Sequence, residues 1–164
     1  MKYLISLLLS LCAFTSVGQD GYSISLGSSL TTNAEGLPVY MNFRMPFPQN
    51  DLFQFGVDLH TYRYSGLDED SNRQKYRAFL ITIPYSISLS SILTEREQNF
   101  DPYAGVAIGF QRAFQDGESY FDGTGLKLFA FGGLRYYFSE EWGIGMQFDY
   151  GTLKSLKFGV CMRY

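Results

Sequence analysis

The segment LKFGVCMRY at residues 156–164 alternates between two kinds of side chain. One set is bulky and consists of Leu156, Phe158, Val160, Met162 and Tyr164. The residues between them are small or cationic. Because a β-strand sends successive side chains to opposite faces, this alternation predicts a strand with one bulky face and one small or polar face. The fold then depends on which of the two faces lies inside.

The same alternation recurs along the chain, and no window shows sustained helical periodicity. We predict strands at residues 21–30, 37–47, 52–64, 76–89, 100–113, 124–138, 142–150 and 155–164. The segments between them are rich in Gly, Asn, Asp, Ser and Pro, which favour turns. The longest predicted connections are 65–75, 91–99 and 114–123.

Side-chain size indicates which face is inside. In the strand at 142–150, the large residues share one face, and Gly143, Gly145, Gln147 and Asp149 share the other. An eight-stranded barrel has an interior just wide enough for side chains to fill, so the bulky set does not fit inside. A continuous apolar outer wall requires lipid around it. We therefore predict an all-β fold, an eight-stranded antiparallel up-and-down transmembrane β-barrel, in which the last strand pairs with the first.

The N-terminal residues 1–18 have the features of a cleaved secretory signal peptide. Lys2 is followed by an apolar run that ends before Ser16 and Gly18, and this run is shorter than a membrane-spanning helix. We place the cleavage site after Gly18, and cleavage after Gln19 is the alternative. The barrel domain then covers residues 19–164.

Composition excludes several functional classes. The formal net charge of the 164-residue chain is −3, and loss of Lys2 makes it more negative, so no nucleic-acid partner is expected. Once the leader is removed, His60 is the only histidine and Cys161 the only cysteine. We therefore predict no metal site, no cofactor and no intramolecular disulfide.

The predicted inner face carries polar and charged residues that should form a network in the lumen: Arg44, Asp58, His60, Lys127, Arg135, Asp149, Lys157 and Arg163. Aromatic residues share that face: Tyr40, Tyr62, Tyr103, Phe129, Phe131 and Tyr137. Together they should fill a narrow bore, which predicts a closed lumen. Antiparallel pairing of the last two strands should set Asp149 opposite Lys157, and these opposite charges should pair.

Three features of the chain resemble a known family: the leader ending SVGQ, the hairpin GGLRYYFSEEWGIGMQFDYG at 132–151, and the terminal aromatic Tyr164. They are similar to the small, OmpX/OmpA-type outer-membrane β-barrels of Gram-negative bacteria. Among these, the sequence resembles the members from Bacteroidetes. The resemblance covers the whole chain after the leader. It implies an outer-membrane location with both termini in the periplasm. It also implies insertion by the barrel-assembly machinery, with Tyr164 in place of the usual terminal Phe as the assembly signal.

That family implies no single activity, because the fold carries adhesins, anchors, narrow channels and lipid enzymes. We predict a monomeric membrane-scaffold or surface-interaction protein without catalysis. The alternatives are a narrow, porin-like channel, a lipid-A-modifying barrel enzyme, and a secreted soluble β-barrel. The enzyme reading would use His60 with Asp58 and a serine such as Ser65. An inward-facing His60 favours a polar lumen group instead.

Three arginines have outward parity at one end of their predicted strands: Arg63, Arg77 and Arg112. An outward cation is tolerated near the membrane interface, and arginine matches phosphate geometry. We expect these residues to contact lipopolysaccharide, with outer-membrane lipid as the surrounding partner. The alternative is that the strands extend past the bilayer and the arginines are solvated.

Overall fold

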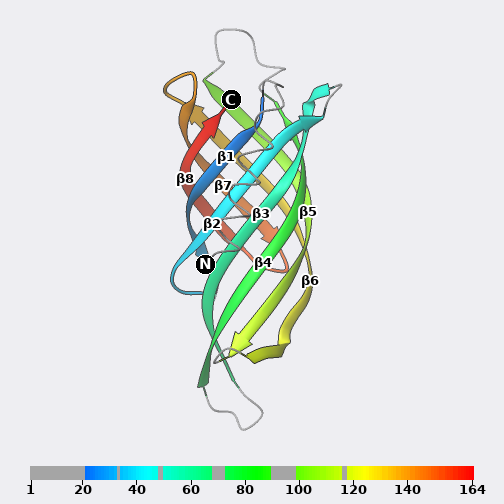
Figure 1. Ribbon diagram of the computed structural model, residues 1–164, viewed down its shortest axis with the longest axis vertical. Coiled ribbons are helices and arrows are strands. Elements are labelled where there is room, and N and C mark those ends of the chain that lie inside the picture. The colour runs from blue at the N-terminus through cyan, green and yellow to red at the C-terminus, as the bar shows by residue number, and fades with distance from the viewer. Residues whose placement is uncertain (1–20, 33, 48–49, 68–72, 90–98, 116–117) are drawn as a thin grey trace, which may run out of the picture.

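Eight antiparallel strands form a closed barrel in the order β1 to β8 (Figure 1). The computed structural model describes residues 21–32, 34–47, 50–67, 73–89, 99–115 and 118–164. The strands are β1 (Ser23–Thr31), β2 (Ala34–Phe47), β3 (Asn50–Leu67), β4 (Arg73–Ser88), β5 (Phe100–Gln115), β6 (Glu118–Tyr137), β7 (Trp142–Gly151) and β8 (Ser155–Arg163). The predicted fold class is confirmed. The predicted leader, residues 1–18, lies outside the described residues.

Pairing of β8 with β1 closes the barrel. The register runs from Ser23 opposite Arg163 to Thr31 opposite Ser155. Beyond it, the Gly21 N–H donates to the Tyr164 carbonyl at 2.6 Å. No strand edge is left unpaired along this seam, as a sheet surrounded by hydrocarbon requires.

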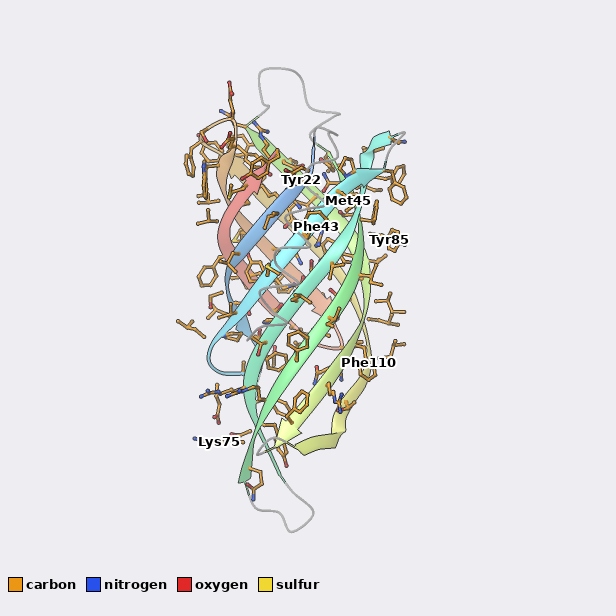
Figure 2. All side chains as sticks on the ribbon, viewed as in Figure 1. Tyr22, Phe43, Met45, Lys75, Tyr85 and Phe110 are labelled. Carbon is orange, nitrogen blue, oxygen red and sulfur yellow. The ribbon has the colours of Figure 1, made fainter. Side chains whose placement is uncertain are left out.

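The orientation of the two faces follows the prediction. Inward residues of β7 and β8, such as Asp149 and Lys157, are buried, whereas Met146, Phe148 and Val160 are exposed. Figure 2 shows the same arrangement for other strands, with side chains such as Tyr85 and Phe110 standing outside the ribbon. The described residues contain no helix that is long and apolar enough to cross a membrane.

The two ends of the barrel differ. At the terminal end, where Gly21 meets Tyr164, aromatic side chains pack outside the wall, for example Phe100 against Tyr136 with ring centroids 4.9 Å apart. At the opposite end, here called the hairpin end, β3–β6 project beyond the turns that join β1 to β2 and β7 to β8 (Figure 1).

These projections correct the predicted loops at 65–75 and 114–123. β3 continues to Leu67 and β4 begins at Arg73, while β5 continues to Gln115 and β6 begins at Glu118. The loop prediction was wrong in extent because polar residues also form strands when a hairpin ladder continues beyond the closed wall. The predicted connection at 91–99 lies almost wholly outside the described residues.

Candidate functional site

The centre of the lumen holds a buried pair of opposite charges from neighbouring strands. Arg44 of β2 donates through Nη1 and Nη2 to the two carboxylate oxygens of Asp58 on β3, the second bond measuring 3.3 Å. Asn42 Nδ2 also donates to Asp58 Oδ1 at 2.8 Å. Arg44 is 1% exposed and Asp58 is 3% exposed. A bidentate contact of this kind fixes both side chains as well as neutralising them.

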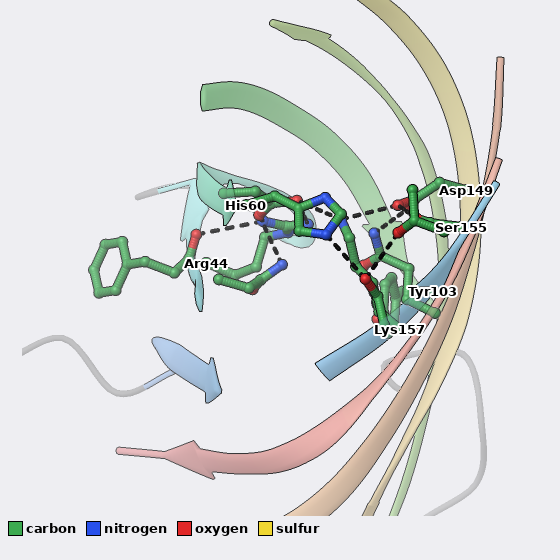
Figure 3. Close-up of polar contacts among 12 residues, drawn as sticks. Arg44, His60, Tyr103, Asp149, Ser155 and Lys157 are labelled. Atoms are coloured by element: carbon green, nitrogen blue, oxygen red, sulfur yellow. Dashed lines mark hydrogen bonds and ion pairs between the residues drawn. The ribbon is translucent and has the colours of Figure 1, made fainter. Parts of the chain in front are cut away.

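Lys157 of β8 joins this pair to a second carboxylate (Figure 3). Its Nζ lies 2.9 Å from Asp149 Oδ2 and 3.5 Å from Asp58 Oδ2. Asp149 accepts two further bonds, each of 2.6 Å, from Gln147 Nε2 and Ser155 Oγ. We call Arg44, Asp58, Asp149 and Lys157 the central charge cluster. Its two cations and two anions balance, which removes most of the cost of burying charge.

A second ion pair lies nearer the terminal end. Arg135 Nη1 is 2.6 Å from Asp101 Oδ2, and Ser88 Oγ donates to the other oxygen of that carboxylate at 2.5 Å. The Arg135 guanidinium also lies 4.2 Å from the Tyr103 ring centroid. Arg135 is one of the predicted network residues. Asp101 is not, although it has the same inward parity as Tyr103 on β5.

Large apolar side chains fill the bore beside the central charge cluster. Tyr103, Phe129 and Phe131 pack together with Leu80 and Ala107. The Arg44 guanidinium carbon lies 5.4 Å from the Phe131 ring centroid, so the cations rest partly on aromatic faces. The cavity left beside the cluster measures about 10 Å³, which is room for no more than about one water molecule.

The hypothetical His60–Asp58–Ser65 arrangement does not form. His60 Nε2 lies 2.9 Å from Ser29 Oγ on β1, and these residues are 2% and 0% exposed. Ser65 Oγ instead donates to Glu35, and Asp58 is held by Arg44 and Lys157. The missed partner, Ser29, has inward parity on β1, but sequence alone does not show which strands face each other across the lumen.

Two predicted network residues lie away from the centre. Lys127 is half-buried and lines a cavity of about 160 Å³ toward the hairpin end, together with Tyr62, Tyr64 and Gln111. Arg163 lies at the terminal end, where its Nε donates to the Glu140 carbonyl at 2.7 Å. Its guanidinium carbon is 4.2 Å from the Tyr137 ring centroid.

Tyr164, the expected assembly signal, is exposed at the terminal end. Its N–H donates to the Tyr22 carbonyl at 3.1 Å, and the two rings stack with centroids 5.1 Å apart. Among the described residues, no group of three or more His, Cys, Asp or Glu side chains is placed to hold a metal ion.

The three outward arginines lie within strands rather than at strand ends. Arg63 of β3 stands directly opposite Arg77 of β4. Arg112 of β5 stands opposite Phe79, and its guanidinium carbon lies 5.2 Å from the Phe114 ring centroid. All three are exposed. The structure therefore brings Arg63 and Arg77 together and places Arg112 diagonally from Arg77 on the next strand.

Comparisons with known proteins show the fold. No protein-family model and no curated protein sequence matches the chain. The outer membrane protein OprG from Pseudomonas aeruginosa is similar, with a TM-score of 0.65 and 10% identity over 88% of this chain and 96% of that chain. The Yersinia pestis outer membrane protein Ail in a phospholipid bilayer nanodisc gives a TM-score of 0.57 and 14% identity, covering 89% and 100%. A de novo designed transmembrane β-barrel gives 0.58 and 12%, covering 90% and 98%.

Identities of this size show the fold alone, and a designed barrel among the matches illustrates that the fold is separable from biological activity. The chain has the closed eight-stranded antiparallel fold of small outer-membrane β-barrels, consistent with the OmpX/OmpA-type resemblance of its sequence.

Proposed function

We propose that the protein is a closed, non-conducting barrel of the outer membrane of a Gram-negative bacterium, with a membrane-scaffold or surface-interaction role and no catalysis. The proposal includes a monomeric state, cleavage of the leader, and insertion by the barrel-assembly machinery with Tyr164 as the signal. The Bacteroidetes-like style of the sequence belongs to the same proposal. The hairpin end then faces the cell exterior, since the termini of such barrels lie in the periplasm.

The filled bore carries this proposal. The central charge cluster and the aromatic side chains around it leave a cavity of only about 10 Å³ at that level of the lumen. A hydrated ion needs a continuous water-filled path, and the cluster offers none. The Asp58 carboxylate is held by two cations, so its charge does not remain available to attract a passing ion.

The same burial weighs against the enzyme alternative. His60 and Ser29 contact each other inside the lumen, whereas a lipid substrate would reach the outer wall or its rim. The exposed apolar outer face weighs against a secreted soluble barrel, because water does not tolerate so large an apolar surface. What remains is a barrel that holds projecting hairpins, β3–β4 and β5–β6, at the membrane surface.

The conductance of the purified barrel tests this proposal. We expect wild-type protein in planar lipid bilayers to give no unitary current steps. A Phe129→Ala, Phe131→Ala variant, checked for folding by its heat-dependent electrophoretic mobility, removes two aromatic side chains from the bore and serves as the widened comparison. Regular current steps from folded wild-type protein would refute the closed lumen and favour the narrow-channel alternative.

A further inference from the structure

The outer wall is interrupted between β2 and β3. Residues 36–38 of β2 stand opposite only Tyr62 of β3, because the register shifts there. Gly36 has a φ of 79°, a conformation that favours glycine, and Leu37 is 71% exposed. A bulge of this kind bends the strand and takes these residues out of the ladder.

A groove of about 410 Å³ lies along this bulge. Apolar Leu37, Pro38 and Val39 line one part of it, and the charged residues Glu35, Arg63 and Arg77 line another. Ligand pockets commonly measure about 300–1,000 Å³, so the groove has the size of a binding site. Its lining joins apolar and cationic surface, which is the combination that a lipid with an anionic headgroup requires.

The charges at this groove are unbalanced. Arg63 and Arg77 stand directly opposite each other, and like charges in that position destabilise a sheet. Glu35 stands opposite Arg63 on its other side and accepts a bond from Ser65 Oγ. The row across the three strands therefore holds two cations against one anion. A phosphate between the two guanidiniums would restore balance, and the planar fork of arginine suits its oxygens.

The height of the row along the barrel fits a lipid headgroup. On β3, the outward side chains Val57, Leu59 and Thr61 precede Arg63, and on β4 Phe79 is the outward neighbour of Arg77. On β3 and β4 the apolar outward positions therefore end before the arginines. Outward cations near an interface cost about 0–1 kcal/mol, against about 2–4 kcal/mol at the midplane, which places this row at the bilayer boundary.

We propose that this groove binds one lipid A molecule. Arg63 and Arg77 would hold one of its phosphates, and an acyl chain would lie along Leu37 and Val39. With Glu35 in the same row, one negative charge on the phosphate balances the excess cation. The several acyl chains of lipid A offer the apolar lining more contact than the two chains of phosphatidylglycerol. The inference rests on the outer-membrane placement proposed above, because lipid A forms the leaflet at the hairpin end.

Native mass spectrometry of the detergent-purified, folded barrel tests the site directly. The probes are lipid A, dioleoylphosphatidylglycerol and inorganic phosphate, each titrated against the protein. We expect one lipid A adduct on the wild type, weaker binding of phosphatidylglycerol, and no displacement of lipid A by inorganic phosphate. An Arg63→Gln, Arg77→Gln variant should lose about tenfold or more in lipid A affinity, because it loses two charge-assisted contacts.

Two comparison variants distinguish binding in the groove from non-specific attraction by surface cations. Lys75→Gln, Lys154→Gln also removes two exposed cations at the hairpin end but changes no residue that lines the groove, and its lipid A affinity should stay within about threefold of the wild type. Thr61→Trp keeps every charge and fills the groove, so it should weaken lipid A binding as the double arginine variant does.

Equal lipid A binding by the wild type and the Arg63→Gln, Arg77→Gln variant would overturn the inference. So would equal losses in the two double variants, or displacement of lipid A by inorganic phosphate. These outcomes concern purified protein and leave the outer-membrane placement intact, since maleimide labelling of intact cells and tryptophan quenching in vesicles decide that placement independently.

Discussion

Lys157 Nζ lies 2.9 Å from Asp149 Oδ2 although the two residues are not directly opposite each other. The cross-strand partner of Asp149 is Ser155, and that of Lys157 is Gln147. The ion pair predicted from sequence therefore forms, but diagonally across the β7–β8 hairpin. A long lysine side chain spans the diagonal, and this geometry also brings its ammonium group to Asp58 on the far side of the lumen.

The central charge cluster should be sensitive to loss of a single partner. Lys157→Met leaves the Asp149 carboxylate buried without its cation, and we expect a loss of about 3–5 kcal/mol in the free energy of unfolding. The double variant Lys157→Met, Asp149→Asn removes both charges and should recover most of that loss. Urea unfolding of the barrel in lipid vesicles measures both values.

Lys154→Met is the matched control for this series, because it removes an exposed lysine three residues away. We expect its effect to stay within about 0.5 kcal/mol. If Lys157→Met proves as mild as this control, the cluster does not stabilise the barrel in the way proposed.

The seam between β1 and β8 should not tolerate an added methyl group. Gly27 stands opposite Gly159, and a Cβ on Gly27 would come within 2.1 Å of the Phe158 carbonyl oxygen and 2.6 Å of the Gly159 Cα. Both contacts are with backbone, which cannot move aside without disturbing the ladder. We expect Gly27→Ala to lower the yield of the compact, heat-modifiable form on refolding into detergent.

Gly132→Ala provides the comparison for the seam, since its added Cβ would meet only the Tyr103 carbonyl oxygen at 3.8 Å. It should refold like the wild type. Equal yields from Gly27→Ala and Gly132→Ala would show that the seam is looser than its geometry indicates.

The hairpin end should be accessible from outside the cell. Lys75 on β4 and Ser139 at the terminal end are both exposed, whereas the native Cys161 is 0% exposed and should stay silent. In intact cells, a membrane-impermeant maleimide should label Lys75→Cys and not Ser139→Cys. Permeabilising the outer membrane should then expose Ser139→Cys. The reverse pattern would invert the proposed orientation.

The alternation of side chains was sufficient to predict the eight strands, their faces and their closure. It also gave the inward parity of Asp58, Asp149 and Lys157, because a two-residue period depends only on local geometry. Contacts across the lumen were harder to predict, such as that of Ser29 with His60, since they depend on barrel closure and on the stagger of strands.

The β2 bulge is a second feature that the alternation of side chains does not predict. It inserts residues without breaking the pattern of outward Glu35, Leu37 and Val39, so alternation gives no sign of it. Gly36 is the one local signal, and a glycine in the predicted turn at 31–36 is equally well explained by the turn itself. For this reason the groove beside Arg63 was found only in the structure.

The claim that the bulky outer face lies against lipid can be tested through Trp142, the only tryptophan in the chain. It stands at the start of β7 near the terminal end and is 42% exposed. With the barrel refolded in vesicles of brominated phospholipids, its fluorescence should be quenched most by chains brominated near the headgroup. Met146→Trp in a Trp142→Phe background lies two outward positions further along β7, and chains brominated deeper should quench it more. We predict this reversal in the order of quenching. Fluorescence unaffected by bromination at either position would contradict a lipid-facing outer wall and would favour a soluble barrel.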